Sequence, residues 1–216
     1  MIYRMVALVR KYFARLMPVG SQRFGRTRIA DLAVRYVKDL GLQGAYLEFG
    51  VYRGSTFSTF YHLFKKHGVQ HSMWAFDSFE GLPAMREGDS GNWYKGQYSC
   101  DLRSFVKFMK MWGVPERAFN VVPVFFDESL TENIPVEQAA IIWIDCDLYS
   151  STVPVLKFIK PLLQDGTLVL FDDFGGTADE GERLALKEFL ADNPELTFSP
   201  YRTFHTKGQS YLVAMK

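Results

Sequence analysis

Short and almost uninterrupted apolar runs alternate with helical patterns over most of this 216-residue chain. Such runs are typical of strands buried on both faces of a sheet, and helical spacing of apolar residues separates them, for example over 55–68. The alternation predicts an α/β fold, a Rossmann-like, doubly wound and mostly parallel sheet with helices on both faces. The five runs are AYLEFG (45–50), SMWAFD (72–77), AFNVVPVFF (118–126), AAIIWID (139–145) and TLVLFD (167–172).

The last two apolar segments, LTFSPY and QSYLVAMK, are joined only by the short stretch RTFHTKG. Parallel strands need a crossover of a dozen or more residues, so this connection is too short for one. We therefore expect an antiparallel terminal strand pair beside the parallel strands. In doubly wound sheets, ligands bind beyond the carboxyl ends of the strands, and the polar residues of this chain gather at those ends.

Capping residues indicate where several of the helices begin and end. Ser55 is expected to cap a helix over 55–68 that stops at Gly68, and Asp101 to cap a helix over 101–112. Further helices are expected over 29–40, from about Val153 to Leu163, and over 179–193.

Residues 1–28 are predicted to form a separate N-terminal element, followed by one domain over 29–216. Residues 1–17, MIYRMVALVRKYFARLM, combine helically spaced apolar residues with four basic ones, and are too short in apolar length for a membrane span. The first interpretation is a helix packed on the domain or on a second subunit, which predicts a homodimer. The second is a basic amphipathic helix on the inner membrane face.

The composition limits the kinds of partner. Lys and Arg total 25 against 24 Asp and Glu, a net charge of +1, so no overall field favours nucleic acid. The two cysteines, Cys100 and Cys146, exclude a disulfide framework. We expect both to be reduced and the protein to be cytoplasmic.

Four carboxylates follow two of the predicted strands. Asp145 and Asp147 come after the run 139–144, and Asp172 and Asp173 come at the end of 167–172. Like charges that lie close together raise each other's pKa, so this arrangement requires a positive partner. Asp147 shares a face with Asp145 if the strand continues. Otherwise it orients the acids that bind the positive partner, or it caps the next helix.

A glycine turn follows the first predicted strand. Gly50 and Gly54 allow a ligand to approach the backbone, and Glu48 is a carboxylate near the end of a buried strand. Asp77 ends the second strand, where an acid can bind both ribose hydroxyls or can cap a turn; Asp127 ends the third and could reach an adenine amine. Together with the antiparallel terminal strand pair, this pattern favours S-adenosylmethionine over NAD. A nicotinamide oxidoreductase would be expected to have the motif G-x-G-x-x-G and parallel last strands, and this sequence has neither.

The blocks LEFGVYRGST, FDSFEGLP, IDCDLYSST and FIKPLLQDGTLVLFDDF resemble the macrocin O-methyltransferase family over about residues 44–191. The resemblance implies a class I S-adenosylmethionine-dependent fold and methylation of a hydroxyl on a small-molecule or glycan acceptor such as a sugar. A catechol-like diol is the alternative acceptor. The cofactor-binding residues it implies are Glu48, Gly50, Val51, Gly54, Ser55, Asp77, Ser78, Phe79, Asp127 and Asp145.

The resemblance also implies a divalent cation, usually Mg²⁺, held by the acids matching Asp145, Asp172 and Asp173, with Asp145 as the base. Oxygen ligands suit a hard cation, and no Cys and His set suggests zinc. His205 is a second candidate base or a structural residue. A non-catalytic binding module is the third hypothesis, but it predicts a broken acid triad, and all three acids are present.

Residues 83–100 form a long polar and aromatic stretch between a predicted strand and a predicted helix. Loops of this length in compact domains are uncommon and often cover a site. Trp93, Tyr94, Lys95 and Tyr98 are therefore expected to lie in a lid over the acceptor, or else to pack on the domain itself.

Overall fold

The computed structural model describes residues 25–127, 130, 134–175 and 180–216. The expectations for residues 1–17, a helix, a dimer contact and a membrane contact, fall outside these residues. The first described helix, α2, begins at Arg26, three residues before the predicted domain boundary. No helix in the described part of the chain is both long enough and apolar enough to cross a membrane.

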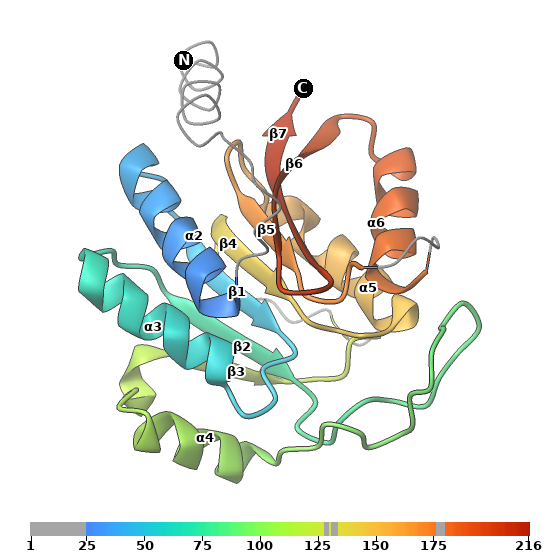
Figure 1. Ribbon diagram of the computed structural model, residues 1–216, viewed down its shortest axis with the longest axis horizontal. Helices are drawn as coiled ribbons and strands as arrows, with labels where there is room; N and C mark the ends of the chain where they lie inside the picture. Colours follow the sequence, from blue (N-terminus) through green and yellow to red (C-terminus); the bar gives the residue numbers. More distant parts are fainter. Residues whose placement is uncertain (1–24, 128–129, 131–133, 176–179) are drawn as a thin grey trace.

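One seven-stranded sheet has the order β3-β2-β1-β4-β5-β7-β6 (Figure 1). The first five strands are parallel, while β7 is antiparallel to both β5 and β6, so the predicted terminal pair is confirmed. The strands are β1 Ala45–Phe49, β2 Met73–Asp77, β3 Asn120–Pro123, β4 Ala139–Ile144, β5 Leu168–Phe171, β6 Leu196–Phe204 and β7 Gly208–Met215.

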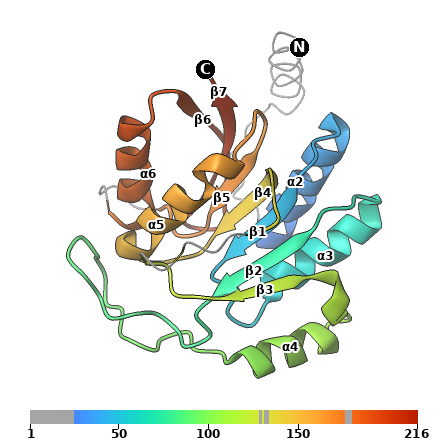
Figure 2. The same ribbon diagram turned by 180° about the vertical axis from the view of Figure 1, so that it is seen from behind.

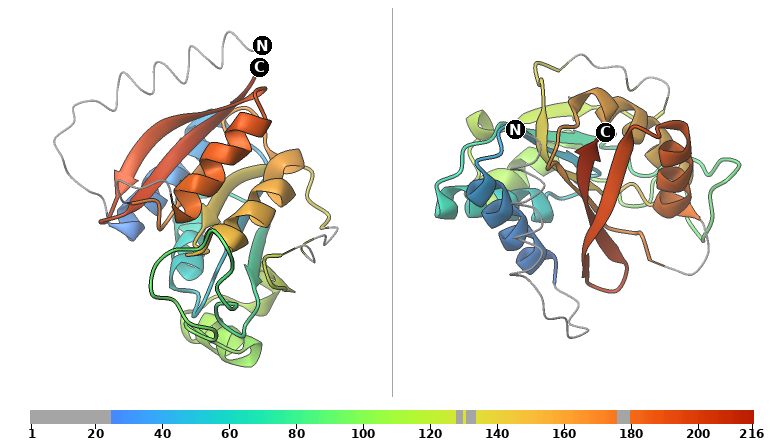
Figure 3. Two further views of the ribbon diagram at one scale, coloured as in Figure 1. Left: turned by 90° about the vertical axis from the view of Figure 1, so that its right-hand side faces the viewer. Right: turned by 90° about the horizontal axis from the view of Figure 1, so that it is seen from above.

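Helices cover both faces of the sheet, as predicted. Figure 1 shows α2 and α3 on the near face, and Figure 2, from behind, shows α5 on the opposite face with α6 beside it. Figure 3 shows α5 and α6 packed side by side, in agreement with their contacts. The helices are α2 Arg26–Leu40, α3 Ser55–His67, α4 Leu102–Met111, α5 Tyr149–Ile159 and α6 Gly181–Asp192.

The sheet separates two apolar cores, because successive strand residues point to opposite faces. On β1, Tyr46 stacks on Phe60 of α3, with ring centroids 4.3 Å apart, whereas Phe49 stacks on Phe76 of β2 beneath α5, at 4.5 Å. Every residue of β1, β4 and β5 is buried. The near-continuous apolar runs of the sequence therefore form the central strands.

Some helix ends agree with the sequence prediction and others differ from it. Gly68 ends α3 in a left-handed conformation, and Asp101 caps α4 by accepting the N–H of Ser104 at 3.0 Å. Gly54, not Ser55, is the N-cap of α3, and it makes no side-chain capping bond. Helix α5 begins at Tyr149, four residues before the predicted start, because its capping group comes from a distant loop described below.

Candidate active site

The carboxyl ends of β1, β2, β4 and β5 meet near the closed end of the β6–β7 hairpin (Figure 1). A cavity of about 320 Å³ lies there. Its walls come from the loops that follow these strands, as expected for a doubly wound sheet. The polar residues that line it include Arg26, Asp77, Ser78, Asp145, Asp147 and Asp173.

Three of the four predicted carboxylates converge at this cavity. Oxygens of Asp145, Asp147 and Asp173 lie within 4.8 Å of one another. Asp147 joins the group because its backbone is left-handed, with φ of 59°, which turns the chain sharply after β4. The sequence left the role of Asp147 open, and the structure puts its carboxylate in the group.

Asp172, the fourth carboxylate, lies outside the converging group. Adjacent residues at a strand end point in opposite directions, so Asp172 and Asp173 part here. The Asp172 side chain is 1% exposed and accepts hydrogen bonds from both Nε and Nη2 of Arg26, with 3.0 Å from Nε to Oδ1. Nε2 of His205 lies 3.1 Å from the same Oδ1. The set predicted from the family resemblance thus differs from the set whose oxygens converge.

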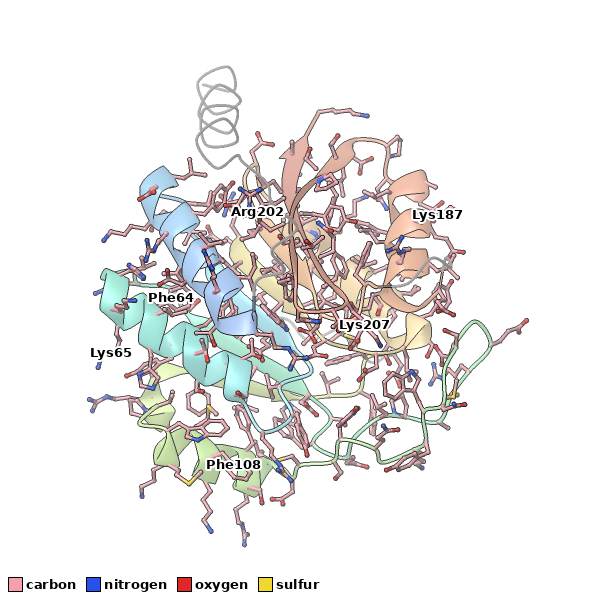
Figure 4. All side chains as sticks on the ribbon, viewed as in Figure 1. Phe64, Lys65, Phe108, Lys187, Arg202 and Lys207 are labelled. Carbon is pink, nitrogen blue, oxygen red and sulfur yellow. The ribbon has the colours of Figure 1, made fainter. Side chains whose placement is uncertain are left out.

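Burial and the neighbouring acids disfavour the charged forms of the converging carboxylates. Burial and neighbouring Asp172 hold the pKa of Asp145 well above its usual value, and burial with Asp173 raises the pKa of Asp147 to about 7. Nζ of Lys207, at the end of the hairpin (Figure 4), approaches Oδ1 of Asp173 at 3.5 Å. Carboxylates placed in this way favour the binding of a further cation.

The glycine turn after β1 is required by close packing within the chain. Gly50 has a φ of +86°, and a Cβ there would lie 1.9 Å from the carbonyl oxygen of Asp145. At Gly54, with φ of +81°, a Cβ would lie 2.1 Å from Cε of Met109 on α4. Gly50 lines the cavity, but Gly54 packs against α4 and is not part of the cavity wall.

Asp77 joins the turn after β1 to the loop after β2. Its Oδ2 accepts the N–H of Tyr52 at 2.9 Å, and its Oδ1 accepts the N–H of Phe79 at 2.8 Å. Both donors have positive φ, 47° and 58°, so Asp77 stabilises two strained turns. Because a carboxylate oxygen accepts more than one bond, Asp77 can still bind a ligand in the cavity. The capping and binding interpretations are compatible.

The other residues predicted to bind the cofactor are dispersed. Glu48 is buried beneath the cavity, where it accepts the hydroxyl of Tyr46. Ser78 lines the cavity, whereas Asp127 lies in a neighbouring hollow, 3.8 Å from Arg86. Three more lie outside the cavity wall. Val51 and Phe79 are in the core, and Ser55 is exposed.

The loop between β2 and α4 borders the cavity and is attached to α5. Asp89 accepts both the N–H and the hydroxyl of Ser150 at 2.8 Å and so caps α5, whose own N-cap residue makes no such bond. Tyr98 lines the cavity and packs edge-on against Tyr52, with ring centroids 5.7 Å apart. Tyr94 is 67% exposed. The predicted lid therefore contributes one aromatic wall.

Several side chains at the site were not predicted from the sequence, among them Arg26 and Glu182. Arg26 was included in the N-terminal linker, although the helical pattern of α2 begins there. Glu182 is 0% exposed and accepts main-chain N–H groups beside the acids, yet in the sequence it is an ordinary acid in the first turn of a helix. Extending the predicted helix back from residue 29 would have included Arg26. No sequence pattern distinguishes Glu182 from other acids at a helix start.

The strand order, with antiparallel β7 between β5 and β6, defines a class I methyltransferase fold. The O-methyltransferase NovP has the same fold, with a TM-score of 0.74 at 20% identity over 87% of this chain and 78% of that one. The model of the macrocin O-methyltransferase (TylF) family matches residues 9–196, and the chain belongs to this family.

Two curated relatives are similar over part of their length. The 8-demethyl-8-(2,3-dimethoxy-alpha-L-rhamnosyl)-tetracenomycin-C 4'-O-methyltransferase of Streptomyces olivaceus is 27% identical over 72% of this chain and 63% of its own length. The mycinamicin III 3''-O-methyltransferase of Micromonospora griseorubida is 26% identical over 62% of this chain and 56% of its own. The chain thus spans less than two thirds of either relative.

Proposed function

We propose that the protein is an S-adenosylmethionine-dependent O-methyltransferase that acts on a hydroxyl of a sugar or a glycosylated acceptor. The observation that carries the proposal is the group formed by Asp145, Asp147 and Asp173 on the wall of a cavity that also contains Asp77. Family membership and the two relatives, whose names describe O-methylation of glycosides, support the acceptor class.

The cofactor is proposed to lie across the carboxyl ends of β1 and β2. Gly50 contributes main chain to the cavity wall there, and Asp77 and Ser78 offer polar groups. S-adenosylmethionine, when bound, supplies an electrophilic methyl group. Main-chain N–H groups hold the Asp77 carboxylate in place before a ligand arrives, which favours ribose binding.

The converging donors fit a hard divalent cation, because all three are carboxylates. We propose that Asp145, Asp147 and Asp173 hold Mg²⁺, while Arg26 keeps Asp172 apart. Mg²⁺, when bound, lowers the pKa of an acceptor hydroxyl.

For the base that takes up the hydroxyl proton, we propose Asp145. Asp147 is the second candidate, because it also lines the cavity and because burial with Asp173 raises its pKa to about 7. The exposed edge of Tyr98, beside Tyr52, offers the acceptor an apolar surface.

Calorimetric titration tests the cofactor assignment. We expect S-adenosylmethionine and S-adenosylhomocysteine to bind with Kd values on the order of micromolar, and NAD not to bind, because the turn after β1 lacks a pyrophosphate cradle. Titration with Mg²⁺ and again with EDTA separates the metal from the cofactor. Folded protein that binds neither compound would contradict the proposal.

We also propose that residues 1–17 mediate dimer formation or contact with an anionic membrane, on the strength of their basic amphipathic sequence. Deleting them is expected either to halve the mass in solution or to abolish binding to anionic liposomes. Measurement of both properties on the same preparations distinguishes the roles. If neither property changes, both roles are wrong.

A further inference from the structure

Glu182 joins the two loops that carry the converging acids. It lies in the first turn of α6, and its side chain is 0% exposed. Its Oε1 accepts the N–H of Cys146 at 3.1 Å, and its Oε2 accepts the N–H of Asp173 at 3.1 Å. One carboxylate therefore bridges the ends of β4 and β5.

These two N–H groups are the first that the parallel sheet leaves without a strand partner. The N–H of Asp145 still bonds to Phe49 at 2.9 Å, and that of Asp172 still bonds to Ile144 at 2.9 Å. One residue further along each strand, the main chain donates to Glu182 instead. Since a buried N–H without an acceptor costs about 1–3 kcal/mol, the carboxylate takes the place of the next rung of the sheet.

The bridge fixes the residues that carry all three converging carboxylates. Cys146 stands between Asp145 and Asp147, and Asp173 itself donates the other bond. The start of α6 approaches closely at Gly181, where φ is +55° and a Cβ would lie 3.6 Å from the carbonyl oxygen of Asp147. One side chain thus bonds to both of the loops that carry the acids.

Charge does not explain an acid at this position. Burial and the neighbouring Asp173 hold the pKa of Glu182 well above its usual value, and within the described residues no basic side chain forms an ion pair with it. A neutral side chain would reduce the repulsion. A carboxylate has two acceptor oxygens at a fixed separation, one for each of the two N–H groups, whereas the glutamine amide has only one.

We infer that Glu182 is a positioning residue that sets the geometry of Asp145, Asp147 and Asp173 for a divalent cation. The inference rests on the proposed function, since it concerns the metal site proposed there. Groups that orient metal ligands typically change metal affinity about 10- to 100-fold when they are altered.

The test compares Mn²⁺ binding by the wild-type protein, Glu182→Gln and the control Glu188→Gln. Mn²⁺ binds oxygen sites of this kind and its electron paramagnetic resonance signal reports the free ion. Glu188 lies on the same helix but is exposed. In Glu182→Gln, an NH₂ group faces one of the two N–H groups, so one bond is replaced by a repulsive contact. We expect its Mn²⁺ affinity to fall about 10- to 100-fold.

Two further measurements, cofactor binding and thermal stability, decide the inference. S-adenosylhomocysteine binding in EDTA should remain near wild type in both variants. The Tm should remain near wild type in Glu188→Gln and fall by a few degrees in Glu182→Gln, because one buried N–H loses its acceptor. Unchanged Mn²⁺ affinity would overturn the inference alone, as would a parallel loss of cofactor binding and Tm, which indicates general destabilisation. A wild-type protein that binds no Mn²⁺ would overturn the proposed metal site as well. If Glu182→Gln does not fold, Glu182→Asp, too short by one methylene to reach both N–H groups, is judged by the same readings.

Discussion

Replacing Asp145 by Asn is expected to abolish methyl transfer while making the metal-free protein more stable. Activity should fall on the order of 10²- to 10⁴-fold, because a proposed base and ligand is lost. In EDTA, the Tm should rise, because burial and the neighbouring Asp172 disfavour the charged form of Asp145, whose pKa is well above its usual value. Activity assays and thermal unfolding with and without Mg²⁺ measure both effects.

Asp145→Asn is thus expected to lower activity and to raise the Tm in EDTA, a combination that general destabilisation does not produce. Asp101→Asn is the control, since Asp101 is exposed, caps α4, and can be replaced by an equally good capping residue. Mg²⁺ should raise the Tm of the wild-type and control proteins but not that of Asp145→Asn. Retention of activity within tenfold would remove Asp145 from the proposed mechanism.

Replacing Glu48 by Gln is expected to stabilise the protein at pH 8 but not at pH 4.5. Burial raises the pKa of Glu48 from 4.5 to about 8. The unfolded chain therefore releases its proton near pH 4.5 and the folded chain only near pH 8, so this group lowers stability as the pH rises between these values. At about 1.4 kcal/mol per pKa unit, the difference reaches the order of 3–5 kcal/mol.

Glutamine is nearly isosteric with a protonated glutamate, and its oxygen can accept the hydroxyl of Tyr46 as Glu48 does. Glu188→Gln is a matched control, because Glu188 also accepts a tyrosine hydroxyl, that of Tyr149 at 2.6 Å, but is exposed. Denaturant unfolding in EDTA across this pH range measures the effect. A stability difference between Glu48→Gln and wild type that does not grow with pH would contradict the prediction.

The strands and their polar ends could be predicted from the sequence because both are local properties. An apolar run long enough for a strand is visible in the residues themselves, and so is the acid that follows it, as in β4 with Asp145 and β5 with Asp172. The antiparallel terminal pair followed from the length of one connection. The position of the cavity followed in turn, since strand ends in such sheets share one edge.

The sequence could not show which of the acids converge, because this depends on contacts between residues that are distant in the chain. Asp172 is withdrawn from the converging group by Arg26, which is 146 positions away. Asp147 enters the group through a left-handed backbone that a non-glycine residue seldom adopts. The early start of α5 likewise depends on Asp89, which lies 61 positions from Ser150.

The two partners of Asp172 come from opposite ends of the domain, and this has a consequence for folding. Arg26 belongs to the first described helix, and His205 to the turn of the terminal hairpin, whereas Asp172 ends a central strand. Both bonds to Asp172 therefore form only when contacts of long sequence separation close, which are slow to form. Asp172 is buried without these partners until both segments have docked, so the sheet and its polar edge should be completed together in a single cooperative step.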